Sequence, residues 1–393
     1  MGTDTLSKGD QRKLERMAVA LERIDGLLLK LGQQGLQRMS RSSLTELQAM
    51  SQTAHNAALI AIERQLDVLA TLAERYMERD PLFQMGQYMA TLNRIWLLTQ
   101  ATRRRHAAGE SPDALLDLIG EARRKYELLD KPITVQPLGA NGWVTDTDFV
   151  GVTIYMAVRD QPGVVVQASN AKPTMYFGND PRKLLNQGVS DYLPYTIRDF
   201  AHGAFTFSNA KVSVDGRISL HKELRVSEAP YIGSAAYKAF AVGQWTDLVE
   251  KLRENELSPL SGSGSVLAYI EPSGFGELDI DMKSSRASAA LLDARGASLM
   301  MDVSLREENN HLIDNLESML ATRRSFPLPE ALFGRVTINQ GQLKFFPMTA
   351  IYNNTVALRQ GPRVHEVHLS LEQVKSGGGG RSKGGAVRKR KKR

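Results

Sequence analysis

The spacing of apolar residues changes near residue 130, and this change sets the expected fold class. Before it, apolar residues recur at alternating steps of three and four, which places each set on one face of a helix that must be buried. Four segments have this spacing: Leu14, Met17, Leu21, Ile24, Leu28 and Leu31; Leu59, Ile62, Leu66, Leu69, Ala73 and Tyr76; Leu82, Met85, Met89, Leu92, Trp96 and Thr99; and Leu115, Ile119, Ala122, Tyr126 and Leu129. Short connections between them predict an antiparallel helical bundle over residues 1–130.

The second of these helices has two interpretations. Leu44, Leu47 and Ala54 lead into it, so we expect one helix of up to about 37 residues, long enough to form a coiled-coil contact with another subunit as well. Leu27 and Leu29 make the apolar stripe of the first helix wider than a two-stranded seam needs. That width favours burial inside one bundle.

After residue 130 the apolar residues alternate instead. Val150, Val152, Ile154, Met156 and Val158 have the period of two that is typical of a strand. Turn residues at 215–216 and 339–341 predict hairpins over 211–220 and 335–345, and helices are expected near 235–240, 245–255 and 305–320. We therefore expect an α+β fold in which the bundle is followed by a mixed, mainly antiparallel sheet domain with interspersed helices, over residues 131–374. The Ser- and Gly-rich stretch 258–265 is a possible boundary inside this domain.

The positive charge of the chain is concentrated at its C-terminal end. The formal net charge is +7, and residues 376–393 carry eight Lys or Arg and no acid, so 7 − 8 leaves about −1 on residues 1–375. Because like charges set in glycine bury nothing, residues 375–393 are expected to form a disordered basic tail. The cations of residues 376–393 are Arg381, Lys383, Arg388, Lys389, Arg390, Lys391, Lys392 and Arg393.

The predicted partner of this tail is the phosphate backbone of DNA or RNA, which cations contact without reading the base sequence. An acidic protein surface, an anionic membrane surface or a transport receptor are alternative partners. A terminus that only promotes solubility is a further interpretation of the same composition.

Motifs that carry catalysis are missing from the sequence. It contains neither phosphate-binding glycine fingerprint, no H-E-x-x-H and no G-x-S-x-G. The absence of cysteine excludes disulfides, thiolate metal sites and cysteine nucleophiles. His365 and His368 are close in sequence, but residues three apart on a strand point to opposite faces and do not hold one metal ion together. We therefore expect no cofactor and assign no catalytic residue.

One acidic strand is the weak candidate for a metal site. Glu277, Asp279 and Asp281 alternate along FGELDIDMK, so all three carboxylates share one face, as a site for a hard cation or an acid/base pair requires. The favoured alternative is a solvated outer face opposite Leu278 and Ile280, because one-sided sheets normally show this alternation.

Two clusters of basic residues end the third and fourth predicted helices. They are Arg103-Arg104-Arg105-His106 and Arg123-Arg124-Lys125. Cations are stabilised at the negative end of a helix dipole, which favours a structural interpretation over phosphate binding.

These patterns predict a cytoplasmic, non-enzymatic protein. The first hypothesis is a nucleic-acid-associated accessory or scaffold protein that uses its basic tail as a tether. The second is a structural subunit of a larger assembly, including a homo-oligomer, whose N-terminal helices contact other subunits. The third is a metal-dependent hydrolase or transferase built on the acidic strand. No stretch approaches the roughly 18 apolar residues of a membrane-spanning helix, so no membrane span is expected.

Overall fold

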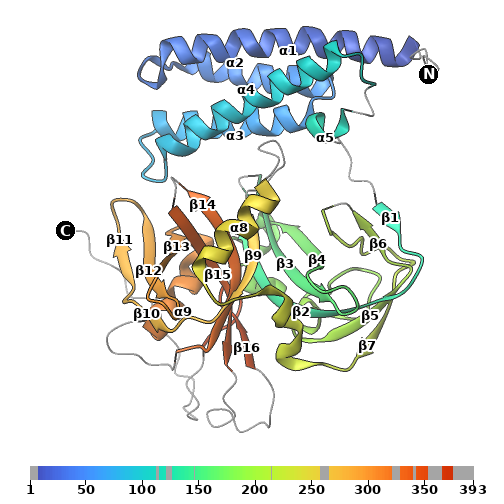
Figure 1. Cartoon of the computed structure of the whole chain (residues 1–393), viewed down its shortest axis with the longest axis vertical. Helices are drawn as coiled ribbons and strands as arrows, with labels where there is room; N and C mark the ends of the chain where they lie inside the picture. The colour runs from blue at the N-terminus through green and yellow to red at the C-terminus, as the bar shows by residue number, and fades with distance from the viewer. Residues whose placement is uncertain are drawn as a thin grey trace.

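The computed structural model shows a helical bundle at one end of the molecule and β-sheets at the other (Figure 1). It describes residues 8–111, 115–120, 126–145, 147–213, 215–256, 265–320, 328–339, 342–352 and 365–374. The predicted α+β class is confirmed, with N-terminal helices followed by mixed, mainly antiparallel sheets. The predicted basic tail at 375–393 and residues 258–264 of the predicted internal boundary lie outside the described residues. The division of the chain at residues 130 and 374 stays a prediction.

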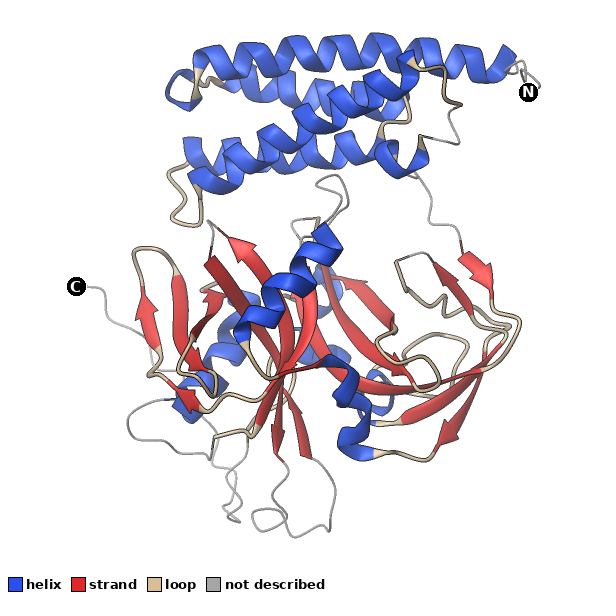
Figure 2. Cartoon of the chain, in the orientation of Figure 1, coloured by secondary structure: helices blue, strands red, loops and turns tan. Residues whose placement is uncertain are grey.

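The bundle is formed by long helices with short connections (Figure 2). They are α1 (Lys8–Gln34), α2 (Arg41–Asn56), α3 (Ile60–Met77) and α4 (Met85–Ala107), with a 3₁₀ turn at Leu36–Arg38 and the short α5 (Leu116–Ile119). Their apolar faces meet in one core, as the helical spacing predicts. Its most buried side chains include Met17, Leu21, Ile24, Leu47, Leu66, Leu69, Ile95 and Leu98.

The prediction of one long second helix is wrong, because the chain turns back between α2 and α3. Ala58 adopts a positive φ of 59°, and the Leu59 N–H donates to the Ala54 carbonyl at 2.9 Å. This is the hydrogen bond of a helix-ending turn whose left-handed residue is usually glycine. Since alanine occupies that position, the sequence carries no signal for the turn.

The predicted buried face of α4 is only partly correct, because Thr99 is buried and Leu92 packs against the core but three of its residues point outward. Met85, Met89 and Trp96 are 50%, 53% and 48% exposed. The side of α4 that faces the core carries Tyr88, Thr91, Ile95, Leu98, Thr99 and Thr102. Two of these threonines are satisfied when buried, because the hydroxyl of Thr99 donates to the Ile95 carbonyl and that of Thr102 to the Leu98 carbonyl at 2.7 Å. Helical spacing therefore exists on two sides of α4, and the more polar side is the buried one.

The fourth predicted helix is wrong at its C-terminal end. Among its described residues Leu116–Ile119 forms the helix α5, whereas Tyr126–Leu128 is the strand β1. It pairs antiparallel with β6 (Lys211–Ser213). We name the part of the chain from β1 onward, which forms the sheets, the β region. Residues 121–125, which include the predicted basic cluster at 123–125, lie outside the described residues.

Besides the β1–β6 pair, the chain forms a five-stranded and a nine-stranded sheet. The five-stranded sheet, which we name the small sheet, has the strand order β4-β3-β2-β5-β7 and is antiparallel throughout. The strand predicted at 150–158 is confirmed as β3, and its residues Val152, Ile154 and Met156 pack against Phe200 of α7. The elements of this region are β2 (Ile133–Val144), β3 (Phe149–Val158), β4 (Val165–Pro173), α6 (Thr174–Phe177), a 3₁₀ turn (Pro181–Leu184), α7 (Ile197–His202), β5 (Ala204–Ser208) and β7 (Arg225–Ala229).

The second, which we name the large sheet, has the order β10-β12-β13-β15-β14-β9-β8, with β11 beside β12 and β16 beside β15. Two of its pairs, β13–β15 and β8–β9, are parallel. Its strands are β8 (Ala241–Val242), β9 (Ser265–Ile270), β10 (Gly274–Phe275), β11 (Asp279–Asp281), β12 (Arg286–Leu292), β13 (Ser298–Ser304), β14 (Ala331–Asn339), β15 (Gln342–Tyr352) and β16 (His365–His368).

Sequence predictions for this region are largely confirmed. The hairpin at 335–345 is β14–β15, and the helix at 245–255 is α8 (Trp245–Glu256), which packs on the large sheet through Trp245, Leu248 and Leu252. The helix at 305–320 begins later, as α9 (Asn310–Leu320) after a 3₁₀ turn (Glu307–Asn309), and the helix at 235–240 is a 3₁₀ helix (Gly233–Phe240).

The two sheets meet where β2 passes close to β15 and β16. A Cβ on Gly139 would lie 2.5 Å from Thr349 Oγ1, so only glycine allows this approach. The Gly142 N–H also donates to Ser370 Oγ at 2.9 Å. This junction places α7 of the small sheet beside the end of β16. Within the described residues, no helix has the length and apolar character that crossing a membrane requires.

Candidate functional site

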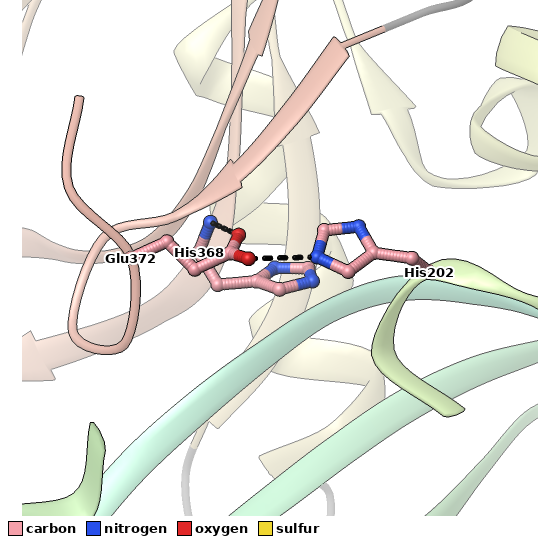
Figure 3. Close-up of side chains that lie close together, drawn as sticks. All are labelled: His202, His368 and Glu372. Atoms are coloured by element: carbon pink, nitrogen blue, oxygen red, sulfur yellow. Dashed lines mark hydrogen bonds and ion pairs between the residues drawn. The ribbon is translucent and has the colours of Figure 1, made fainter. Parts of the chain in front are cut away.

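A partly buried polar cluster lies at the junction between the two sheets (Figure 3). His202 comes from α7, His368 from the end of β16 and Glu372 from the turn that follows. His202 Nε2 lies 2.9 Å from Glu372 Oε1, and the His368 N–H donates to Glu372 Oε2 at 3.2 Å. Among the described residues, these three form the one group of His, Asp or Glu side chains whose ligand atoms all lie within 4.8 Å of one another.

Local structure brings these side chains together. The Glu372 N–H donates to the His368 carbonyl at 2.8 Å, and this turn folds the Glu372 carboxylate back over β16. On the other side, a capping box between Thr196 and Asp199 fixes the start of α7. The helix is only six residues long, so its start also sets the position of His202 in its last turn.

Hydrogen bonds define the protonation of His368. Its Nε2 lies 3.0 Å from the Ala201 carbonyl oxygen, which only accepts, so Nε2 carries the proton. Nδ1 then accepts from the Thr349 hydroxyl at 3.0 Å. Burial lowers the pKa of His368 to about 4, so the ring is neutral near pH 7.

The neighbouring pair, His202 and Glu372, has pKa values shifted in opposite directions. Burial lowers the pKa of His202, but the hydrogen bond and the charge of Glu372 outweigh it and raise this pKa above its usual value. Burial likewise raises the pKa of Glu372, whereas the hydrogen bond from His202 and the nearby histidines lower it to about 2. Arg198 adds a further hydrogen bond to Glu372 Oε1 at 3.0 Å. The carboxylate is therefore ionised and satisfied on both oxygens.

This arrangement fits a closed hydrogen-bond network rather than a metal centre. The two imidazole rings are tilted by 31° with centroids 4.6 Å apart, so they lie nearly stacked. Zinc needs free nitrogen lone pairs about 2.0–2.1 Å from the ion. Since both ring nitrogens of His368 already have partners, an ion would have to displace Thr349 or Ala201.

A second buried carboxylate extends the network along β16. Glu366 lies two residues before His368 and accepts hydrogen bonds from the hydroxyls of Tyr231 and Tyr237. Burial raises the pKa of Glu366 to about 6, although both tyrosine bonds favour the carboxylate. Sequence reasoning missed this network because its members come from distant segments. The four-residue spacing of His368 and Glu372 is the one local signal that could have indicated part of it.

The centre of the cluster is closed to a substrate in this conformation, although His202 at its edge is partly exposed. Thr349 and His368 form a hydroxyl–imidazole pair that resembles a nucleophile and its base, but both side chains are completely buried. Their hydrogen bonds join α7 on the small sheet to β15 and β16 on the large sheet. We therefore assign the cluster a structural role.

The acidic strand lies on an outer face of the large sheet. Glu277, Asp279 and Asp281 are exposed, and Leu278 and Ile280 between them pack against the core. Hydrogen bonds from Ser284 Oγ and the Lys283 N–H hold the pKa of Asp281 below its usual value. The three carboxylates are not among the described groups whose ligand atoms converge within 4.8 Å.

The basic cluster at the end of α4 is largely neutralised by ion pairs at the surface of the bundle. Arg103 donates to Asp25 of α1, and Arg105 Nη2 lies 2.6 Å from Glu110 Oε2. These ion pairs, together with the helix dipole, account for two of the three arginines. Arg104 is exposed.

A different basic surface lies on α1, beside a groove between α1 and α2. The groove has a volume of about 400 Å³. Its walls include Arg16, Val19 and Arg23 of α1, with Thr53 and Asn56 of α2 opposite. This surface of α1 differs from the end of α4, because its arginines border an apolar groove and those of α4 are in ion pairs.

Three arginines share this face of α1. Arg12, Arg16 and Arg23 are spaced by four and seven residues, which places them on one side of the helix. All three are exposed, and no carboxylate of the described chain forms an ion pair with them, although Glu15 also lines the groove. The spacing is present in the sequence, but the acidic residues between these arginines make α1 look mixed in charge, so it gave no prediction of a basic face.

The tail residues predicted to bind phosphates, Arg381, Lys383 and residues 388–393, lie outside the described residues. No known family model matches the sequence, and a search of curated proteins finds no match either.

Proposed function

We propose that this chain is a non-enzymatic accessory protein that associates with the phosphate backbone of DNA or RNA. The basic residues of 376–393 provide the main contacts, and the arginine face of α1 provides a second, fixed contact. The helices and sheets around them form the body that this association brings to the nucleic acid.

The observation that supports the proposal best is the unpaired arginine face of α1. Arg12 and Arg23 are 11 residues apart, or roughly 16 Å along the helix axis. Guanidinium groups bind phosphate oxygens through paired hydrogen bonds. Because these arginines have no ion-pair partner within the described chain, binding a phosphate does not require a carboxylate to be released. Arg103 and Arg105, by contrast, would first have to leave Asp25 and Glu110.

The charge distribution supports the same proposal. Residues 376–393 carry eight cations and no acid. If about six of them contact duplex DNA, the logarithm of affinity falls with the logarithm of salt concentration at a slope near −5. Three further contacts from α1 would steepen the slope to about −8. Binding of this kind is independent of base sequence.

The test measures binding of the full chain to labelled duplex DNA and single-stranded RNA by fluorescence anisotropy over a salt series. Deletion of residues 376–393 should cause the largest loss of affinity and the largest change in slope. The triple variant Arg12→Ala, Arg16→Ala and Arg23→Ala should flatten the slope by about 3 units.

A matched control removes the same number of cations elsewhere. Lys183, Lys222 and Arg225 are exposed on the β region, and their replacement by Ala should leave the slope nearly unchanged. Equal affinity of the full chain and the tail-deleted chain would contradict the proposal. Binding to poly-glutamate in preference to both nucleic acids would also contradict it and would indicate an acidic protein partner.

A further inference from the structure

The groove between α1 and α2 has a lining that phosphate contacts alone do not need. Arg16, Val19, Ala20 and Arg23 follow one another at steps of three, one and three, so they share one face of α1. Ala20 and Ala57 are buried, and Val19 between the two arginines is 52% exposed. The volume of about 400 Å³ lies within the range of small-ligand sites. A phosphate gains nothing from this apolar floor.

The α2 side of the groove presents hydrogen-bond acceptors. Helix α2 ends at Asn56, and the last carbonyls of a helix carry partial negative charge. The Thr53 hydroxyl donates to the Ala49 carbonyl at 2.9 Å, so its oxygen remains an acceptor. Glu15 adds a carboxylate to the lining. These groups repel a phosphate and suit the N–H groups of a ligand.

The α1 rim has the opposite preference. Arg16 and Arg23 are exposed, and no carboxylate of the described chain forms an ion pair with either. The Nε of Arg16 donates to the Arg12 carbonyl at 3.4 Å, a bond that uses none of its terminal nitrogens. A guanidinium group binds phosphate oxygens through its edge and stacks on flat rings through its face. The groove therefore fits a ligand with an anionic group, a flat apolar body and N–H donors at the far edge.

We propose that this groove receives one unpaired nucleotide of a bound nucleic-acid strand. The phosphates flanking that nucleotide contact Arg16 and Arg23, its base lies on Val19, and the edge of the base faces Thr53 and Asn56. A base inside a duplex has both faces stacked and its edge paired, so the groove selects single strands. Helix α1 lies on the side of the bundle away from the sheets, which leaves this face open to a strand (Figure 1).

This inference rests on the proposed function and adds a contact to bases that the tail does not supply. Residues 376–393 contain no aromatic residue, so the tail binds phosphates without stacking on bases. A preference of the full chain for strands that carry bases must then come from the folded part.

The first experiment compares two labelled single-stranded DNAs of equal length, one with bases and one built entirely of abasic residues. Both carry the same phosphates, so the tail and the arginines bind them alike. Fluorescence anisotropy with the full chain should show affinity about fivefold or more higher for the strand with bases. Equal affinity would overturn the inference and leave the proposed function standing, whereas no binding to either strand would overturn both.

A groove variant and a matched control assign the preference to this site. Val19→Asn removes the apolar floor without changing charge, and should lower affinity for the strand with bases to that for the abasic strand. Val68→Asn is the control, because Val68 is a 39% exposed valine on α3 that does not line the groove. It should leave both affinities unchanged. An equal loss for both strands in Val19→Asn would overturn the inference, because it would show a general effect on the helix.

The second experiment measures cover of the groove without altering its arginines. The chain contains no cysteine, so alkylation of Val19→Cys by a maleimide reports on this one position. The strand with bases should slow the reaction several-fold, and the abasic strand should slow it much less. Leu29→Cys is the control, since Leu29 is a 64% exposed residue of α1 outside the groove. Equal slowing of Val19→Cys by both strands would overturn the proposed position of the base.

Discussion

The helical bundle and the β region use their polar and charged residues in opposite ways. In the bundle, Thr99 and Thr102 of α4 bond within their own helix, and the α1 arginines and Met85, Met89 and Trp96 of α4 stay exposed. In the β region, His202, Glu366, His368 and Glu372 are drawn into the junction between two sheets. The difference shows that the titratable residues that most resemble a catalytic or metal site, those of the His202–His368–Glu372 cluster, join the two sheets.

Removal of His368 should give the largest effect in this comparison. His368→Leu leaves the Thr349 hydroxyl and the Ala201 carbonyl buried without a partner, which should lower the free energy of unfolding by about 3–5 kcal/mol. Hydrogen exchange followed by mass spectrometry should show loss of protection in α7 and β16 and little change in α1 to α4. Equal loss of protection in both regions would contradict the separation we describe.

Glu366 should make the stability of the β region depend on pH. Its pKa in the folded chain is about 6, against 4.5 in the unfolded chain. A raised carboxyl pKa contributes stability that is full below pH 4.5 and is lost as the pH rises through 6. Relative to the parent chain, Glu366→Gln should therefore gain about 2 kcal/mol between pH 4.5 and pH 7. Urea titrations at several pH values measure this difference, and a difference that does not vary with pH would refute the burial of an ionising Glu366.

Two threonine substitutions of identical size compare the regions directly. Thr349→Val removes the donor to His368 Nδ1 and should cost about 1–3 kcal/mol. Thr99→Val removes only a hydroxyl that bonds to the Ile95 carbonyl of its own helix, and should cost less than about 1 kcal/mol. Both side chains are completely buried, so burial does not explain the difference. Equal losses in thermal unfolding would show that the cluster is not a special stabilising feature.

The smallest expected effect concerns the turn between α2 and α3. Ala58→Gly should raise the free energy of unfolding by up to about 1 kcal/mol, because glycine adopts a positive φ without the steric cost that alanine carries. Ala57→Gly is the control, since Ala57 has a φ of −91°. It should be neutral or destabilising. A loss of stability in Ala58→Gly would mean that the turn is not formed as described.

The sequence predicted those parts of the fold that depend on local pattern. The switch in apolar period, the strand at 150–158 and the hairpin at 335–345 all follow from side-chain alternation and turn residues. The break at Ala58 and the outward orientation of Met85, Met89 and Trp96 were not predictable in this way. The first uses alanine where glycine is expected, and the second depends on which of two helical faces the other helices cover.

The candidate site shows the same limit more strongly. His202 and His368 are 166 positions apart in the chain, and only the meeting of the two sheets brings them into contact. The exposed face of Glu277, Asp279 and Asp281, in contrast, follows from strand alternation alone. Whether residues 376–393 bind phosphates stays a prediction, because it depends on a partner and not on the fold.

Hydrogen exchange of the full chain with and without duplex DNA tests the central claim most directly. Our account predicts that DNA slows exchange along the Arg12–Arg23 part of α1 and leaves α7 and β16 unchanged. Slowed exchange at α7 and β16, with α1 unchanged, would place the functional surface at the His202–His368–Glu372 cluster and contradict the account.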